Sequence, residues 1–386
     1  MKKVILISTI HFILFIIPFK VLAHGTEEHS GEEVTNYWNY GLIASLVLLV
    51  IFLGFFLLAK RKKKGLNMKN KDNRNKHQLI SKRSTFYSWG IALSSVLVII
   101  FLVMVNVNGE EEITFQHIHG LGYTSNGEEL YVPVHDGLRV YKDGTWTIPT
   151  AGENHDYMGF SMFKEGFYSS GHPAPGSDLA NPLGIIKSTN KGETIKLLDL
   201  YEEVDFHGMT VGYENQDIYV FNLRKNSRMN QPGLYYSTDE TKTWNQSELQ
   251  GLKAQATSLT AHPTEQGVVA LGTVEGVVLS EDYGNTFEKL SISNIVSAVS
   301  FGHQNNLLVA TETNEGAKLY QIDLSTNQTN ELVLPDLQDA TINYVKQNPK
   351  NKEEFVFATK QKDIYFSSDS GNTWVKSADQ GVAITH

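Results

Sequence analysis

Histidine and carboxylate side chains gather in one part of this 386-residue chain, where six of the 13 histidines lie between residues 117 and 207. Three short segments in this stretch share a pattern and align on Gly120, Gly159 and Gly208. The alignment gives two columns of side chains: His117, Asp156 and Asp205 in the first, and His119, Met158 and His207 in the second. Residues two apart in a strand point the same way, so we expect both columns to face one volume.

Three kinds of chemistry fit these columns. Imidazole and thioether groups bind copper or zinc, which makes His119, His207 and Met158 candidate metal ligands. Asp156 and Asp205 are candidate catalytic residues, because two carboxyl groups about 5 to 9 Å apart can cleave a glycoside as acid and base. In that case His119 and His207 would bind sugar hydroxyls. The third interpretation is a buried network in which the same side chains satisfy one another, and the sequence leaves all three open.

An internal repeat identifies the elements that carry these residues. The pattern Ser-x-Asp-x-Gly-x-Thr-aromatic, an Asp box, occurs at residues 237–244, 280–287 and 367–374, with a weaker copy at 188–195. In such a turn the Asp side chain accepts backbone N–H groups and Gly takes a positive φ. The aromatic ring then packs between neighbouring sheets. Each copy therefore predicts a tight turn between two strands.

The spacing of the motif predicts the fold. Its copies begin 49, 43 and 87 residues apart, which indicates that one unit before the last copy has lost the motif. A period of about 40 to 50 residues with four short strands per unit is typical of a β-propeller. We therefore expect an all-β, six-bladed β-propeller over residues 110–386, with residues 381–386 as a closing strand. The six units should begin near Thr114, His155, Val204, Ala254, Asn294 and Asp339.

Propeller geometry predicts where the polar residues meet. The innermost strand of each blade lines the central channel, and it begins on the face where the second strand ends. His135 and His172 follow the second strands of the first two units, so we expect them beside the two columns. Together with His117, Tyr157 as a stacking surface and Arg228 from a long loop, they are candidate ligand-binding residues. The Asp boxes should lie on the opposite face.

The repeats resemble those of the BNR/Asp-box proteins, a family that includes sialidases, sortilin-type receptor domains and photosystem assembly factors. Five segments are similar to a bacterial exported subgroup usually labelled glycosyl hydrolase: residues 117–122, 155–160, 170–176, 205–209 and 226–229. The resemblance implies a glycosyl hydrolase if the protein is an enzyme. Sialidases of this fold bind a carboxylate with three arginines. Here only Arg139, Arg224 and Arg228 follow residue 108, two of them four residues apart, so sialidase activity is not expected.

The first third of the chain predicts a membrane anchor. Two apolar runs approach the roughly 20 residues that span a bilayer as a helix. Eleven basic residues and one acidic residue lie between them, which places the connecting segment in the cytoplasm. The expected order is a signal peptide at 1–23, an acidic extracellular segment at 24–39, a transmembrane helix at 40–59, a basic cytoplasmic loop at 60–88, a transmembrane helix at 89–108 and the extracellular propeller at 110–386.

Charge narrows the range of partners. After residue 108 there are 37 acidic and 19 basic residues, which argues against nucleic acid as a ligand. We expect a protein of the cytoplasmic membrane whose extracellular propeller binds a small molecule, a glycan, a copper or zinc ion, or another extracellular protein. One alternative is a glycosyl hydrolase of the Asp-box type that uses Asp156 and Asp205. Another is a non-enzymatic scaffold for assembly or protein interaction.

Overall fold

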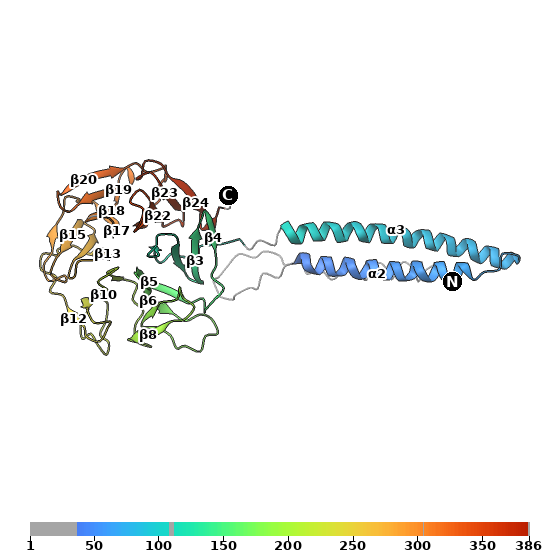
Figure 1. The fold of residues 1–386 in the computed structure, drawn as a ribbon, viewed down its shortest axis with the longest axis horizontal. Helices are drawn as coiled ribbons and strands as arrows, with labels where there is room; N and C mark the ends of the chain where they lie inside the picture. Colours follow the sequence, from blue (N-terminus) through green and yellow to red (C-terminus); the bar gives the residue numbers. More distant parts are fainter. Residues whose placement is uncertain (1–36, 108–111, 304, 385–386) are drawn as a thin grey trace. The chain divides into compact units, whose positions relative to one another are not determined.

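The computed structural model describes residues 37–107, 112–303 and 305–384, which belong to two compact units that meet at Glu111 and Glu112. The described part of the first unit is helical, and the second unit is built from strands (Figure 1). The predicted signal peptide at residues 1–23 and most of the predicted acidic segment lie outside the described residues.

Two long helices, α2 (Tyr37–Lys64) and α3 (Lys71–Val107), form the first unit and are long and apolar enough to cross a membrane. They lie side by side (Figure 1), and the rings of Phe55 and Tyr87 stack at 5.6 Å between centroids. Many of their apolar side chains remain exposed, as with Leu93 at 65%. Such exposure is expected of a surface that contacts lipid rather than water.

The connection between these helices is shorter than the loop predicted from the sequence. Residues 60–64 complete the last turn of α2, residues 65–70 form the turn, and α3 already begins at Lys71. Lysine and arginine are good helix formers, so a basic segment can extend a helix beyond its apolar part. The basic segment is therefore mostly helical, and Lys63 Nζ donates to Ser81 Oγ at 3.3 Å across the turn.

Six antiparallel sheets make up the second unit, and each consists of strands that are consecutive in the chain. The first blade contains β1 (Gly122–Tyr123), β2 (Leu130–Val134), β3 (Gly137–Lys142) and β4 (Thr145–Thr147). The second contains β5 (Asp156–Phe163), β6 (Gly166–His172), β7 (Ile185–Ser188) and β8 (Lys196–Asp199). The third contains β9 (Met209–Val211), β10 (Ile218–Asn222), β11 (Gly233–Ser237) and β12 (Asn245–Gln246).

The remaining three blades repeat this order. The fourth contains β13 (Ala256–Ala261), β14 (Val269–Thr273), β15 (Gly276–Ser280) and β16 (Glu288–Lys289). The fifth contains β17 (Ile295–Phe301), β18 (Asn306–Thr313), β19 (Gly316–Asp323) and β20 (Gln328–Leu332). The sixth contains β21 (Ile342–Gln347), β22 (Phe355–Thr359), β23 (Ile364–Ser367), β24 (Val375–Asp379) and β25 (Val382–Ala383). The predicted six-bladed propeller is confirmed.

The core lies between neighbouring blades. β2, β14 and β22 are buried along their whole length, because each blade is covered on both faces by its neighbours. One apolar cluster joins Tyr168 of the second blade to Val220 of the third, and similar clusters link other pairs of blades. Burial of these strand residues from both sides stabilises the ring of blades.

The repeated turns have the predicted hydrogen bonds. In three of them the Asp carboxylate accepts from the backbone N–H of the Thr four residues later: Asp239 from Thr243 at 2.9 Å, Asp282 from Thr286 at 2.8 Å and Asp369 from Thr373 at 2.9 Å. Thr241 replaces the motif's Gly in the first of these and adopts a φ of 68°. In the fifth blade the motif is replaced by a different turn, in which Asp323 accepts from the N–H groups of Ser325 and Thr326.

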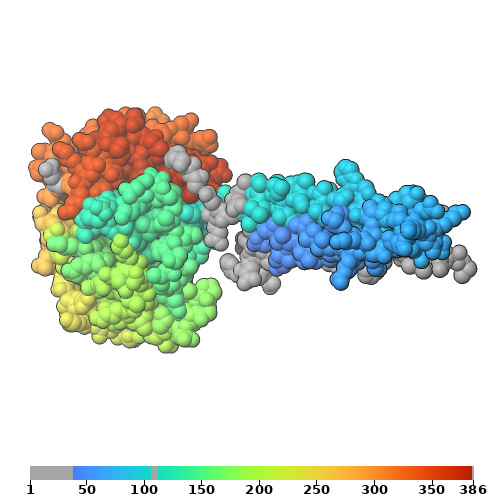
Figure 2. All heavy atoms as spheres, turned by 45° about the vertical axis from the view of Figure 1, so that its right-hand side comes forward, coloured from blue at the N-terminus to red at the C-terminus, as the bar shows by residue number. Residues whose placement is uncertain are grey.

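The two ends of the propeller are joined, as the sequence predicts. Thr114 forms an antiparallel bridge with Val382 of β25. The N–H of Phe115 donates to the carbonyl of Gly381 at 2.7 Å, and the N–H of Ala383 donates to the carbonyl of Ile113 at 2.8 Å. Figure 2 shows the surface of the first blade, in teal, directly beside that of the last, in red. The closing strand therefore connects the first and sixth blades.

Candidate functional site

Three predicted residues of the first two blades, His119, His135 and Asp156, lie close together. His119 precedes β1 and is held beside β2 by its own N–H, which donates to the carbonyl of Pro133 at 2.9 Å. His135 directly follows β2, and Asp156 is the first residue of β5. The start of an innermost strand and the end of a second strand thus share one face, as propeller geometry predicts.

Asp156 lies between two imidazoles. Its Oδ2 is 2.6 Å from His135 Nδ1, and its Oδ1 is 3.2 Å from His119 Nε2. One ligand atom from each of these three residues lies within 4.8 Å of the others. The ring of His117 is 4.7 Å from that of His135, measured between centroids. We call His119, His135 and Asp156 the first cluster.

The surroundings of the first cluster favour the ionised form of its carboxylate. Burial alone would raise the pKa of Asp156, but the nearby imidazoles of His119 and His135 outweigh it, and the pKa is lowered. The pKa of His117 is also lowered, first by burial and then by the neighbouring imidazoles. An ionised carboxylate is the form in which Asp156 can act as a metal ligand.

One pair of atoms in the first cluster is close without being well bonded. His119 Nε2 and Asp156 Oδ1 are both buried and lie 3.2 Å apart, yet neither makes a hydrogen bond of acceptable geometry with any described residue. Buried polar atoms are normally satisfied. Two ligand atoms that face a shared ion would show this arrangement, since each points at the ion rather than at the other.

A second cluster repeats the design one blade further on. Asp205, just before β9, lies between His172 at the end of β6 and His207: its Oδ2 is 3.4 Å from His172 Nε2 and 3.1 Å from His207 Nε2. His172 Nδ1 lies 2.6 Å from Oδ1 of Asn181, a residue that the sequence did not single out. This second cluster is more open, since the His207 side chain is 65% exposed.

The predicted metal set of His119, His207 and Met158 is therefore divided. His119 belongs to the first cluster and His207 to the second. Met158 is two residues beyond Asp156 in β5 and only 6% exposed. The alignment treated these residues as one set, whereas in the structure each aspartate contacts the imidazoles nearest to it.

Tyr157 and Arg228 do not join either cluster. Tyr157 is 1% exposed, and its ring packs on that of Phe167 at 5.3 Å, so it offers no stacking surface to a ligand. It follows Asp156 in β5 and so points to the other side of the strand. Arg228 donates through Nε to Asp199 at 2.9 Å and through Nη2 to the carbonyls of Thr241 and Lys242. Its role in these contacts is to fix a loop of the third blade.

Comparisons with known proteins relate the chain to others by fold. No protein-family model matches it, and no curated protein matches its sequence. A GH74 enzyme from Niastella koreensis is similar in structure, with a TM-score of 0.49 and 16% identity, over 71% of this chain and 46% of that one. YCF48 bound to a D1 peptide gives 0.43 and 17%, over 69% and 82%. TolB from Acinetobacter baumannii gives 0.47 and 11%, over 73% and 68%.

These similarities concern the β-propeller fold alone. This chain spans about half the length of the GH74 enzyme, and identity is below one fifth in all three cases. A propeller hosts many unrelated activities, so the function has to be argued from the side chains themselves.

Proposed function

We propose that the protein is a membrane-anchored extracellular propeller that binds a zinc or copper ion through His119, His135 and Asp156. The observation that carries this proposal is the convergence of three ligand atoms within 4.8 Å of one another, contributed by two blades. Two imidazoles and a carboxylate form a common zinc set, and a fourth position then remains for an external ligand. The imidazole of His117 borders the first cluster, and its pKa is lowered by burial and by the neighbouring imidazoles.

The hydrogen bond between His135 and Asp156 is compatible with this role. At 2.6 Å it aligns the ring with the carboxylate before any ion arrives. An ion that binds Nδ1 of His135 displaces the proton of this bond, so binding should release protons and weaken in acid. The three groups project from strand ends and a tight turn rather than from a long loop, which limits the rearrangement that binding requires.

The anchor is proposed from the two helices. α2 ends in Arg61, Lys62, Lys63 and Lys64, and the turn that follows joins it to the basic start of α3. Basic residues beside membrane helices are retained in the cytoplasm. A hairpin with its turn in the cytoplasm places the C-terminal end of α3, and the propeller that follows it, on the extracellular side.

In the glycosyl hydrolase alternative, Asp156 is not suited to be the general acid. Both mechanisms of glycoside cleavage need one carboxyl group that stays protonated near neutral pH, with a raised pKa. The pKa of Asp156 is lowered by its two histidines. An ionised, doubly paired carboxylate suits a ligand of a cation better than a general acid.

Metal titration of the full chain tests the proposal. The protein is purified in detergent, stripped with a chelator and titrated with zinc and with copper(II) by calorimetry. We expect one tight site per chain that is lost in His119→Ala and kept in His207→Ala, the matched change in the second cluster. The proposal fails if the wild type binds neither metal, or if both variants bind as the wild type does. Circular dichroism of each variant confirms that it is folded.

A further inference from the structure

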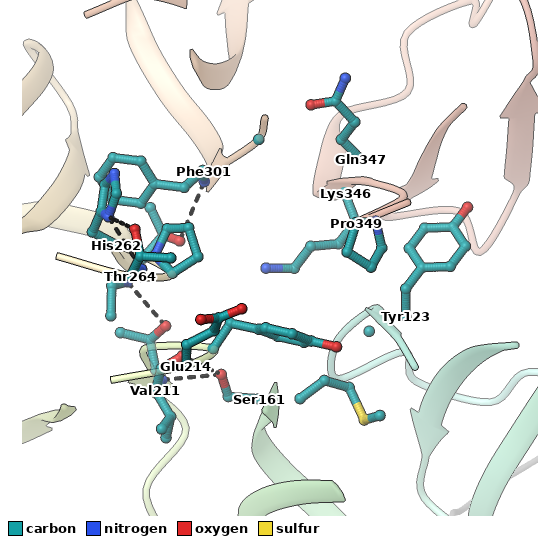
Figure 3. A pocket seen from close by; sticks show the side chains of 18 of the residues that line it. Tyr123, Ser161, Val211, Glu214, His262, Thr264, Phe301, Lys346, Gln347 and Pro349 are labelled. Atoms are coloured by element: carbon teal, nitrogen blue, oxygen red, sulfur yellow. Dashed lines mark hydrogen bonds between the residues drawn. The ribbon is translucent and has the colours of Figure 1, made fainter. Parts of the chain in front are cut away.

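A separate cavity lies at the opposite mouth of the channel. It has a volume of about 370 Å³ and is lined by residues from all six blades (Figure 3). Its lining includes the ends of the innermost strands, such as Val211, Ala261, Phe301 and Gln347, whereas the two histidine clusters lie at the beginnings of these strands. The volume falls within the usual range for small-molecule sites.

The innermost strands carry one equivalent position near this cavity. Three of them use it to bond the next blade: Ser161 Oγ accepts from the N–H of Val211 at 3.0 Å, Thr210 Oγ1 from that of Ala261 at 3.2 Å, and Thr260 Oγ1 from that of Phe301 at 3.5 Å. The donating residues Val211, Ala261 and Phe301 each come directly after the equivalent position of their own blade, which is Thr210, Thr260 and Ser300 respectively. We call this series the channel ring, and its members in the six blades are Gly122, Ser161, Thr210, Thr260, Ser300 and Lys346.

Lys346 breaks the chemical pattern of the channel ring. It is the penultimate residue of β21, as Thr210, Thr260 and Ser300 are of their own strands. Four blades place a small hydroxyl here, and the first has Gly122, where a Cβ would collide with Met162. An ammonium group only donates, so Lys346 cannot accept a backbone N–H as the hydroxyls do. Figure 3 shows its side chain extending into the cavity.

Some of the other polar groups around the cavity are already bonded, whereas the hydroxyls of Tyr123 and Tyr213 in its lining make no hydrogen bond within the described residues. His262 Nε2 lies 2.9 Å from Asn305 Oδ1, and its Nδ1 accepts from the N–H of Glu265 at 2.9 Å. Gln347 Oε1 accepts from the N–H of His303 at 2.7 Å, and its amide donates to the Lys352 carbonyl. These bonds fix the wall of the cavity, and neither His262 nor Gln347 bonds to the lysine.

Lys346 itself has no partner among the residues that the structure describes: no hydrogen bond or ion pair joins its ammonium to them. Burial lowers the pKa of Lys346 to about 8. Although Glu214 also lines the cavity, its carboxylate forms no ion pair with this lysine within the described parts. An unpaired cation in such surroundings is unfavourable for the free protein, and a bound anion would remove that cost.

We propose that this cavity binds a small organic acid, with its carboxylate or phosphate group on Lys346 and its hydrocarbon part against the apolar wall. The wall supplies Met162, Val211, Pro263, Phe301 and Pro349 around the ammonium. The site is independent of the first cluster, from which it is separated by the length of the innermost strands. It therefore does not depend on whether the protein binds a metal.

The reactivity of Lys346 provides a direct test in the full chain. Reductive methylation at neutral pH modifies only neutral amines, so a lysine with a pKa about 8 reacts roughly tenfold or more faster than an ordinary lysine. Labelling of each lysine is measured by mass spectrometry with sodium butyrate, monobutyl phosphate or sodium chloride present. We expect one or both organic anions to slow Lys346 several-fold relative to chloride. Lys289, which is exposed and lies outside the cavity lining, should be unaffected.

A pair of variants separates a ligand site from a structural role. Lys346→Ser restores the hydroxyl of the channel ring, so it should unfold at a higher temperature than the wild type while losing any thermal shift caused by butyrate or monobutyl phosphate. Lys289→Ser, a change to an exposed lysine outside the cavity lining, should keep that shift. The proposal is wrong if neither anion protects Lys346 from methylation, or if Lys346→Ser responds to the anions as the wild type does.

Discussion

Nδ1 of His135 lies 2.6 Å from Oδ2 of Asp156, so a side chain at the end of a second strand is bonded to the first residue of the next blade. His172 and Asp205 repeat this relationship one blade further on, at 3.4 Å. Both contacts cross a boundary between blades. An ion bound at the first cluster would therefore connect two blades and would depend on their relative position.

The carboxylate of Asp156 should be essential for metal binding. In Asp156→Asn the shape is kept but the charged donor is lost, and zinc affinity should fall at least about hundredfold. Asp205→Asn, the matched change in the second cluster, should leave the affinity unchanged. Calorimetry measures both, and equal losses in the two variants would show that the ion is not held by the first cluster.

The same variant has an expected effect on His117. Burial and then the charges of His135 and His119 lower the pKa of His117, whereas the charge of Asp156 raises it. Removing that charge should lower the pKa of His117 further, so that the ring stays neutral to a more acidic pH. Titration of the histidine resonances by NMR without metal measures this shift, and an upward shift in Asp156→Asn would contradict the assigned geometry.

The repeated turns should contribute to stability in a pH-dependent way. Hydrogen bonds from the Thr373 side chain and backbone lower the pKa of Asp369 to about 2. A carboxyl with a lower pKa in the folded state stabilises it above the unfolded pKa and loses that effect as the pH falls through the folded pKa. Asp369→Asn should therefore lower the unfolding temperature at neutral pH and have little effect near pH 2. A deficit that persists in acid would refute this explanation.

Lys346 should make stability depend on pH in the same direction, but in the alkaline range. Its pKa of about 8 lies below the ordinary 10.5, so between these values the unfolded chain binds a proton that the folded protein does not. Stability should rise with pH across that interval, by about 3 kcal/mol from this group. Denaturant unfolding of the wild type and of Lys346→Met isolates the effect as a difference. A difference that is constant between pH 8 and 10.5 would mean that the lysine is ordinarily solvated.

The topology can be tested because the chain contains no cysteine. Lys69→Cys, in the turn between the helices, and Lys253→Cys, on the propeller, each introduce one exposed thiol. In intact cells a membrane-impermeant maleimide should label Lys253→Cys only, and both after the cells are broken. Labelling of Lys69→Cys in intact cells would reverse the proposed orientation.

The fold could be predicted because its signal is local and repeated. Each Asp box is a turn whose hydrogen bonds lie within a few residues. The spacing between its copies therefore indicates the number of blades, even though the fifth blade uses Asp323 in another turn. The face shared by His119, His135 and Asp156 followed from strand direction alone. Strand alternation also separates Tyr157 from Asp156, but the sequence analysis did not apply it to that residue.

Contacts between side chains that are distant in the sequence were not predicted. Arg228 was expected over the channel, but its partner Asp199 lies on the preceding blade, and no spacing in the sequence reports that contact. Lys346 was missed because only the first three units were aligned residue by residue. Extending the alignment to all six would have placed a lysine among Ser, Thr and Gly, which is a signal present in the sequence.

The pairing of Thr114 with Val382 has a consequence for biosynthesis. A ribosome delivers the first blade long before the residues that seal it, so the growing disc keeps two bare sheet edges until Val382 has emerged. Those edges are open to wrong partners during that interval. A stop codon a few positions upstream of Val382 would leave all six blades but remove the strand that joins the sixth blade to the first. Such a truncated protein should be a preferred substrate for quality-control proteases.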